Sequence, residues 1–336
     1  MGPQIKSVQQ HLLNIVQDLI PDKYSLVFEL SELLGLSSDS VYRRLRGETL
    51  LTIEEVQQIC TKFNISFDSI CGSDDLTTVA FKFHRIRGEN DFKEHLISIR
   101  NDLKVLQTKE DVHVTYAAID MPFFHNFRFP VINTFKSFYW LKSVSNYPAY
   151  QPLKFSCKFI NEELNNLGME IYKIYCSLPS TEIWTDLIHN SILKQISYYW
   201  DSGEFSSKDD ALQLCDEVEQ QFALIRQMAE KCSKIPDEEQ TVKKKDNFEV
   251  YFSEIQVATH CIQVRVDNFK TVYLSNQTFN KLVTSNVSFN EETDRWLNNI
   301  IKKSILISGV GEKQRYKFFK SVFDKISALK DKIANY

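Results

Sequence analysis

The sequence has few residues arranged to bind a metal, form a disulfide framework or cross a membrane. Its seven cysteines are an odd number, lie far apart and include no CxxC pair, and its seven histidines form no HxH or HxxxH pair. This pattern argues against a zinc site and for a reducing compartment. No apolar run reaches the ~18 residues of a membrane helix, and the opening MGPQIKSVQQ lacks the apolar core of a signal peptide. We therefore expect a cytoplasmic protein with no metal site and no membrane span.

Catalytic motifs are missing as well. The segment SGVGEKQR, residues 308–315, contains glycines and a lysine without the spacing of a phosphate-binding loop. No nucleophile elbow or paired-carboxylate motif is recognisable. We therefore expect no enzymatic activity and no cofactor. An enzyme regulated through its first domain would have to show an activity or a bound cofactor on purification.

Residues that break helices are scarce. The 336 residues include 9 glycines and 8 prolines, against 24 phenylalanines and 14 tyrosines. Hydrophobic residues make up 43% of the chain and charged residues 25%, as in ordinary globular proteins. The length allows two or three domains. These features predict a mainly α fold with a minor β component (α+β), in which an N-terminal five-helix bundle precedes a larger helix-rich α+β domain.

Positive charge gathers at one place in an acidic segment. Residues 1–75 hold 6 Lys and Arg against 11 Asp and Glu, a net charge of −5, and three of these six are Arg43, Arg44 and Arg46. A nucleic-acid-binding module is usually basic as a whole. The acidity therefore argues against tight nonspecific DNA binding and directs attention to the arginine cluster.

Signals for two helices and a tight turn surround this cluster. One apolar helix face is formed by Leu26, Leu30, Leu33 and Leu34. Gly35 then suits the left-handed residue that ends a helix. Ser37 or Ser38 can cap the next helix, with Asp39 in its first turn.

Further helices complete this first domain. Thr52 and Glu55 form a capping-box pattern, and a short closing helix is expected around Phe67 and Ile70. With a leading helix upstream, we expect residues 1–71 to form a domain of five short helices.

Residues 25–70 resemble the helix-turn-helix of phage-repressor (Cro-type, XRE-like) bacterial transcription regulators. The positions that carry this resemblance are Leu30, Ser31, Leu34, Gly35, Leu36, Ser37, Val41 and Gly47. The sequence departs at Arg44 and Leu45, where the family usually places an apolar residue followed by a glutamate. The resemblance implies that the helix after the turn lies in the major groove of DNA.

The outer face of that helix carries the candidate DNA-binding residues. Arginine can bond both O6 and N7 of guanine, while serine and other polar groups hold phosphates. We expect Asp39, Tyr42 and Arg43 near base edges, and Ser38 and Arg46 on the DNA backbone. The alternative interpretation is a solvated helix face of a protein-contact module.

Beyond a polar linker at residues 72–78 the pattern changes. Alternating and helical segments at the start of residues 79–233 predict a small strand–helix–strand element, and residues 155–233 are helical almost throughout. An apolar stripe along residues 214–229 suits a long antiparallel arm or a dimer contact. We expect residues 79–233 to form an effector and dimerisation domain.

Residues 121–144 are dense in aromatic side chains and are interrupted by charged ones. One interpretation is a helix buried in a core. The other is an aromatic-lined ligand pocket that includes Phe135, with His125 or Arg128 as its polar anchor. The spacing of these residues does not identify a ligand.

The C-terminal third begins with a charged segment, residues 234–247, which we expect to be a mobile connector. Residues 248–336 predict antiparallel strands followed by helices. The last helix has heptad spacing at Phe319, Val322, Ile326, Leu329 and Ile333, which suits either its own domain or a paired interface. Residues 302–332 hold nine Lys and Arg against three Asp and Glu, and this charge would either touch DNA phosphates or balance the acidic first domain.

These observations favour a transcription regulator that binds double-stranded DNA sequence-specifically as a homodimer, because two half-sites multiply the specificity of one short helix. The region from residue 79 onward would dimerise and sense a small-molecule or protein effector. The alternative is a protein-interaction adaptor that uses the helical bundle and the helical C-terminal region without binding DNA.

Overall fold

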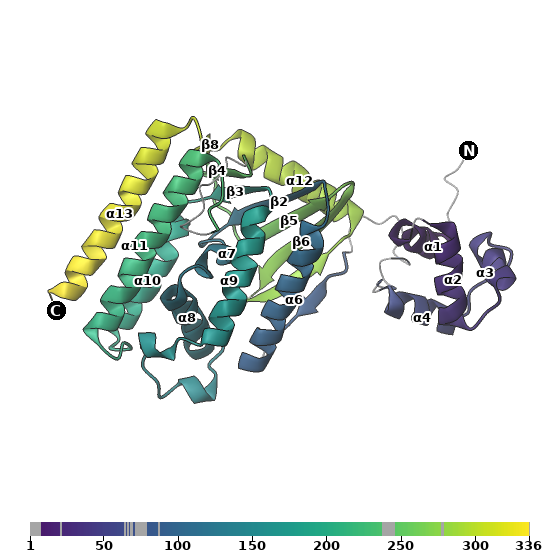
Figure 1. Cartoon of the computed structure of the whole chain (residues 1–336), viewed down its shortest axis with the longest axis horizontal. Helices are drawn as coiled ribbons and strands as arrows, with labels where there is room; N and C mark the ends of the chain where they lie inside the picture. Colours follow the sequence, from purple (N-terminus) through teal and green to yellow (C-terminus); the bar gives the residue numbers. More distant parts are fainter. Residues whose placement is uncertain are drawn as a thin grey trace. The chain divides into compact units, whose positions relative to one another are not determined.

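A computed structural model describes residues 8–20, 22–63, 65, 67, 70, 79–86, 88–236, 246–276 and 279–335. It divides the chain into two compact units, residues 1–80 and 81–336. Figure 1 shows the elements of both, and each unit is described by itself. The predicted linker at 72–78 and most of the predicted connector, residues 237–245, lie outside the described residues.

The N-terminal unit is a small helical bundle. Its helices are α1 (Val8–Leu19), α2 (Lys23–Leu34), α3 (Ser38–Leu45) and α4 (Ile53–Lys62). They enclose a core of Leu12, Val16, Leu26, Leu30, Val41, Ile59 and Ile70. The closing helix predicted around Phe67 and Ile70 falls mostly outside the described residues.

Local hydrogen bonds fix the boundaries of these helices. Gly35 ends α2 in the left-handed conformation (φ 64°), and its N–H donates to the Ser31 carbonyl. Ser37 caps α3, because its Oγ accepts from the Ser40 N–H. Thr52 and Glu55 form the capping box of α4. The predicted turn and capping box are confirmed, and of the two candidate serines it is Ser37 that caps α3.

The C-terminal unit is built on a mixed sheet. Its eight described strands run in the order β1-β7-β6-β5-β2-β3-β4-β8. Their bounds are β1 (Lys82–His84), β2 (Val112–Ala118), β3 (Ser180–Trp184), β4 (Phe248–Phe252), β5 (Cys261–Val266), β6 (Phe269–Asn276), β7 (Asn280–Thr284) and β8 (Ile305–Leu306). β2, β3 and β4 are parallel, and the other pairs are antiparallel.

Helices cover both faces of this sheet. They are α6 (Glu89–Gln107), α7 (Phe123–Asn126), α8 (Pro130–Tyr139), α9 (Glu162–Ser177), α10 (Leu187–Asp201), α11 (Lys208–Lys231), α12 (Val287–Lys302) and α13 (Glu312–Ala334). A π-helical turn (Trp140–Val144) and short 3-10 turns (Pro148–Tyr150 and Cys157–Phe159) link α8 to α9. α12 packs on one face, in a small cluster with Val272, Leu297 and Ile300. The other helices share a large core with the opposite face (Figure 1). The molecule is therefore of the α+β class, as the sequence predicts.

The sheet joins segments that the sequence suggested as separate domains. Strands from 79–233 and from 248–336 alternate in it, so both segments belong to one compact unit. β3 is a fully buried strand inside the stretch expected to be helical almost throughout. β4 pairs in parallel with β3, while β5, β6 and β7 form the antiparallel part.

The predicted connector also begins differently. Lys234 and Ile235 are buried, and the backbone N–H of Lys234 donates to the Asn247 side chain at 3.1 Å. Both ends of residues 234–247 are therefore fixed to the C-terminal unit. The expectation of a mobile connector is wrong for these end residues.

α11 and α13 lie side by side in the C-terminal unit (Figure 1). The apolar stripe of α11 is buried, and so are the heptad positions Phe319, Val322, Ile326, Leu329 and Ile333 of α13. Both stripes pack within their own unit. This supports the interpretation of α13 as part of its own domain.

Candidate nucleic-acid interface and cavity

α3 presents a polar stripe to solvent. Asp39, Arg43 and Arg46 are exposed and follow one another at steps of four and three residues, which places them on one side of the helix. Ser38, in the first turn, is exposed as well. Tyr42 is half-buried and packs against the core, so only part of its ring is accessible.

Glu48, in the loop after α3, lies between the two exposed arginines. Arg46 donates to both of its carboxylate oxygens, at 2.7 and 3.0 Å, and the Arg43 Nε lies 3.7 Å from one of them. The hydrogen bond from Arg46 lowers the pKa of Glu48. Because exposed ion pairs are weak, a phosphate or a base edge can replace Glu48 as the partner of either arginine.

Arg44 has a different role from its two neighbours. It donates from Nε and Nη2 to the two oxygens of Glu55, at 3.0 and 2.8 Å, and both side chains are only 14% exposed. Glu55 also accepts the Thr52 N–H at 2.9 Å. The pair therefore connects α3 to the start of α4, and the predicted cluster of three arginines presents two to solvent.

α1 holds the loop that follows α3. The Gln9 Nε2 donates to the carbonyls of Arg44 and Thr49, each at 2.9 Å, and its Oε1 accepts the Leu51 N–H at 2.8 Å. These bonds fix the segment that carries Arg46 and Glu48, so the outer face of α3 is preorganised.

The geometry of this unit is that of a helix-turn-helix with an arginine-bearing second helix. Residues 20–80 match the family model of the BetR domain. This is a helix-turn-helix-like DNA-binding domain. The match lies within the first unit, which is called the BetR domain from here on, and it does not extend to residues 81–336. Neither a curated protein nor a solved structure shows a detectable match to the chain.

The BetR domain also exposes several large apolar side chains. Tyr24 and Phe28, four residues apart on α2, are 82% and 65% exposed. Leu50 and Ile53, at the start of α4, are 74% and 84% exposed. Apolar side chains this exposed often take part in protein contacts.

The C-terminal unit contains a cavity of about 160 Å³ between α6 and the sheet. The wall from α6 includes Phe92, Leu96, Ile99 and Leu103, and Phe123 and Phe124 close one side. Strands β2, β5, β6 and β7 supply the facing wall. An apolar cavity of roughly 150 Å³ can hold a molecule such as benzene, so the space suits a small organic ligand.

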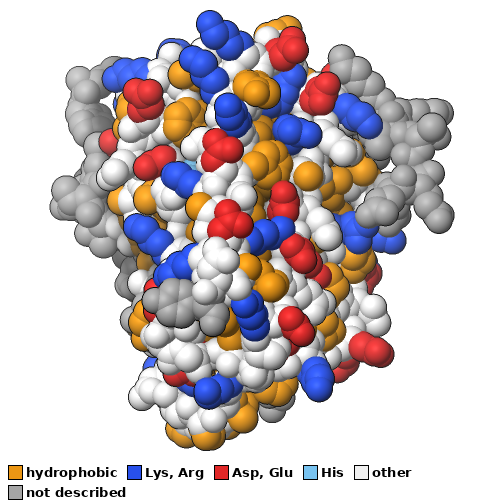
Figure 2. Space-filling view, turned by 90° about the vertical axis from the view of Figure 1, so that its left-hand side faces the viewer, with side chains coloured by type: hydrophobic (Ala, Val, Ile, Leu, Met, Phe, Trp, Pro, Cys, Tyr) orange, Lys and Arg blue, Asp and Glu red, His pale blue; other side chains and the backbone are white. Residues whose placement is uncertain are grey.

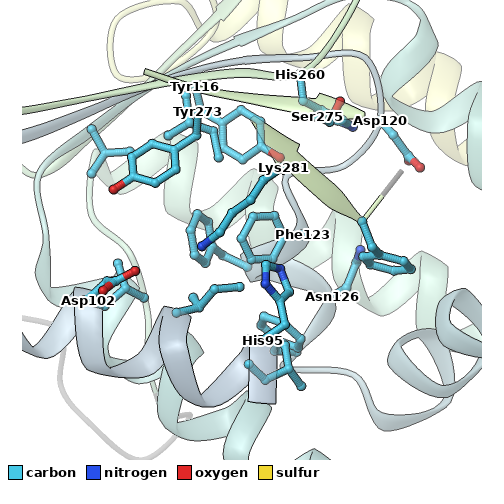
Figure 3. A pocket seen from close by; sticks show the side chains of 18 of the residues that line it. His95, Asp102, Tyr116, Asp120, Phe123, Asn126, His260, Tyr273, Ser275 and Lys281 are labelled. Carbon is cyan, nitrogen blue, oxygen red and sulfur yellow. The ribbon is translucent and has the colours of Figure 1, made fainter. Parts of the chain in front are cut away.

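Polar groups lie at separate places around this cavity (Figure 3). Lys281 points into it beside His95, with Asp102 on the same side, while Asp120 lies on the other side. Asp120 accepts from the Lys136 ammonium, which also donates to the Gln195 Oε1 at 3.0 Å. The second side is therefore internally neutralised.

The histidines of the cavity are held neutral. Burial lowers the pKa of His95 to about 4, assisted by the nearby charge of Lys281. Burial lowers the pKa of His260 to about 4 as well. The His260 Nδ1 is buried and has no hydrogen-bond partner among the described residues.

The residues predicted from sequence to line a pocket lie elsewhere. His125 is 1% exposed, and its Nε2 is 2.8 Å from the Glu182 carboxylate. Phe135 is fully buried among aromatic rings, including those of Phe155 and Phe205. Arg128 is half-buried and does not line the cavity. None of these three residues lines the cavity, and the burial of His125 and Phe135 favours the other interpretation of residues 121–144, a helix buried in a core. Phe123 and Phe124 from the same aromatic segment do line the cavity.

Glu182 explains the burial of His125. This carboxylate also accepts from the Tyr175 hydroxyl at 2.7 Å and from the Trp184 Nε1 at 2.9 Å. Burial acts to raise its pKa, but the charge of His125 and the hydrogen bonds from His125 and Tyr175 hold the pKa below the usual value. Both oxygens of the Glu182 carboxylate thus have hydrogen-bond partners, which favours a structural role for its contact with His125. The His125 Nδ1 is buried and has no hydrogen-bond partner among the described residues.

Sequence reasoning missed Lys281 and His95. Phe92, Leu96, Ile99, Leu103 and Leu106 recur at helical spacing in the sequence, and all five line the cavity from α6. Nothing in the sequence near Lys281 marks it, because the strand pairing of β7 brings it opposite α6.

Two of the nine basic side chains of residues 302–332 form ion pairs within their own unit. Lys330 forms ion pairs with Asp216 and Glu219 of α11, and Lys332 with Asp201 at the end of α10. Figure 2 faces the α13 side and shows blue and red side chains intermixed. These pairs give Lys330 and Lys332 a role within the C-terminal unit, in place of contact with DNA phosphates or compensation of the acidic first domain.

The described part of the chain shows no group of three or more His, Cys, Asp and Glu side chains placed to hold a metal ion. Its six described cysteines are free. None of the described helices has both the length and the apolar character needed to cross a membrane.

Proposed function

We propose that this protein is a cytoplasmic bacterial transcription regulator of the Cro type that binds double-stranded DNA sequence-specifically and has no enzymatic activity. The observation that carries the proposal is the exposed Asp39, Arg43 and Arg46 stripe on α3 of a BetR domain. α3 enters the major groove with this stripe facing the bases.

Each residue of the interface has a distinct role. Arg43 reads a guanine edge, and Asp39 accepts from a base amino group. Arg46 and Ser38 hold phosphates. Arg46 leaves Glu48 for a phosphate when DNA arrives, because the exposed pair exchanges readily. Tyr42 contributes only its accessible edge.

The regulator acts as a homodimer. One eight-residue helix reads few base pairs, so two copies on neighbouring half-sites are needed for discrimination. The C-terminal unit dimerises and senses an effector. The cavity beside α6 supports the sensing part of this proposal.

A fluorescence-anisotropy titration tests the role of α3. On a duplex selected by the full chain, Arg43→Ala should lose about 1–3 kcal/mol of discrimination against a substituted guanine. Arg46→Ala should weaken binding to all sequences and reduce the salt slope by about one. Arg295→Ala, at an exposed arginine of α12, is the matched control and should bind as the parent does. Equal discrimination by Arg43→Ala and the parent contradicts the assignment.

The second candidate is a protein-interaction adaptor. The exposed apolar side chains of the BetR domain, among them Tyr24, Phe28 and Ile53, and its acidic charge favour it. Salt separates the two functions, because DNA binding weakens steeply through counterion release whereas apolar docking hardly changes. Paired Tyr24→Ser and Phe28→Ser substitutions should abolish partner binding in an adaptor and leave DNA affinity unchanged in a regulator.

A further inference from the structure

The positive charge of Lys281 in the cavity favours a ligand with a negative charge. It lies on β7, in register with Ser275 of β6 and His84 of β1. Directly opposed residues of antiparallel strands project to the same face of the sheet. That face looks toward α6, and Figure 3 shows the Lys281 side chain extending into the cavity.

The Lys281 ammonium has no ion pair and no hydrogen bond within the described residues, and the nearest ring contact is Tyr273, with its centroid 5.8 Å from Nζ. Lys136, the other lysine of the cavity, is bound to Asp120 and Gln195. Burial lowers the pKa of Lys281, and the nearby Asp102 only opposes this shift. An anion at this place would replace the lost solvation of the ammonium.

The surroundings of Lys281 favour a ligand with an apolar body. α6 lines the cavity with Phe92, Leu96, Ile99 and Leu103, and Phe123 and Phe124 add two aromatic rings to its wall. His95, beside the Lys281 ammonium, is neutral because burial lowers its pKa to about 4, so one of its ring nitrogens can donate a hydrogen bond. Asp102 also lines the cavity but is exposed to solvent, and burial of its carboxyl raises its pKa. Asp120 is neutralised by Lys136.

We propose that this cavity binds a small amphipathic carboxylate, whose anionic group pairs with Lys281 and His95 and whose apolar body lies along α6. The inference rests on the effector-sensing role proposed for the C-terminal unit and gives the effector its chemical class. The closed polar network at Asp120 and Lys136 leaves the Lys281 side as the place for the negative charge.

Isothermal titration calorimetry on the full chain tests this with octanoate and 1-octanol, which share a hydrocarbon chain and differ in charge. The parent should bind octanoate about tenfold or more tightly than octanol, as one charge-assisted hydrogen bond predicts. Lys281→Met should lose this preference while still binding octanol. Lys270→Met, on neighbouring β6 and paired with Asp294 outside the cavity, should keep it.

Two further variants keep the test decisive. If Lys281→Met does not fold, as judged by circular dichroism, Lys281→Gln replaces it; Lys281→Arg should retain the preference for octanoate. Equal binding of octanoate and octanol by the parent, no binding of octanoate, or an unchanged preference in the uncharged variant each overturns the proposal.

DNA titrations without octanoate separate this proposal from the regulator function. A parent that binds octanoate through Lys281 but no DNA refutes the regulator and leaves the ligand site standing. A parent that binds DNA but shows no preference for octanoate refutes the ligand class alone.

Discussion

The two units of this chain differ in how far apart along the sequence the residues lie whose contacts determine the structure. In the BetR domain, the caps of α2, α3 and α4 involve partners three to five residues away. In the C-terminal unit, β2 is hydrogen-bonded to β3 and to β5, whose residues lie far along the chain. A site on the first unit is therefore visible in the sequence, whereas the cavity of the second exists only after the sheet has assembled.

The charges follow the same contrast. Arg43 and Arg46 of the BetR domain point to solvent, with a weak exposed pair to Glu48 as their alternative partner. In the basic C-terminal segment, Lys330 and Lys332 pair with acidic residues of α10 and α11. The arginines of the BetR domain are thus available to a new partner, whereas the paired lysines of the C-terminal segment hold helices of their own unit together.

The largest expected change in unfolding free energy comes from Phe135 and tests whether this residue belongs to the core of the C-terminal unit or to a pocket. Phe135→Ala should lower the unfolding free energy of this unit by about 3–5 kcal/mol, because it empties a fully buried aromatic site. Calorimetric unfolding of the full chain measures this. Phe269→Ala, at a ring that is 61% exposed, should be nearly neutral. If Phe135→Ala leaves the unfolding free energy unchanged, Phe135 is not part of the core, and its interpretation as a pocket residue stands again.

A smaller effect separates the three arginines of the BetR domain. Arg44→Met should destabilise this domain by about 2 kcal/mol, since it leaves the partly buried Glu55 without its bidentate partner. Thermal unfolding followed by circular dichroism measures the change. Arg43→Met, at an exposed site, should leave the melting temperature unchanged, and equal effects of both substitutions would contradict the structural role of Arg44.

Acid should weaken the C-terminal unit. Burial and the neighbouring Lys325 lower the pKa of His189 from 6.5 to about 4. Between these values the unfolded state binds a proton that the native state does not, so stability is present above pH 6.5 and declines as the pH falls toward 4.

Urea unfolding near neutral pH and near pH 5 tests this linkage. The parent should lose on the order of 1–2 kcal/mol more than His189→Gln over that interval. Glutamine can still accept from Lys325, so the variant removes the titration and keeps a polar partner. An identical pH dependence in both proteins is the contrary result.

The smallest effect concerns the turn of the helix-turn-helix. Gly35→Ala should cost about 1 kcal/mol, because Gly35 is left-handed at φ 64° and a Cβ there would meet no other atom within 4 Å. The expected loss of unfolding free energy therefore comes only from the left-handed backbone conformation and not from a steric clash. Denaturant unfolding of the BetR domain within the full chain measures it, and a stabilised variant would contradict the role given to this glycine.

Much of the BetR domain follows from the sequence. Gly35, Ser37 and the Thr52–Glu55 pair are signals that act through the nearest turn of backbone, and each does what the residue type predicts. The exception is Arg44, whose partner Glu55 lies on the next helix. Only the position of Glu55, which the fold brings next to α3, distinguishes Arg44 from Arg43.

The C-terminal unit was predictable only in its α+β class and in the apolar faces of α6, α11 and α13. β3 was missed because its five residues are buried on both faces and so lack the alternation of a half-buried strand. Because β3 was missed, its buried Glu182 was missed as the partner of His125. His125 was therefore interpreted as a possible ligand anchor, since it is a polar residue in an aromatic segment. Lys281 became part of a site through strand pairing alone.

The most direct test of the central claim is a selection of bound sequences from random duplex DNA by the full chain, with the mass of the complex measured alongside. We predict enrichment of a palindromic site that carries two chains, and loss of that enrichment in a variant with Arg43→Ala and Arg46→Ala. No enriched sequence from the parent, or the same enrichment from the variant, would contradict the placement of α3 in the major groove.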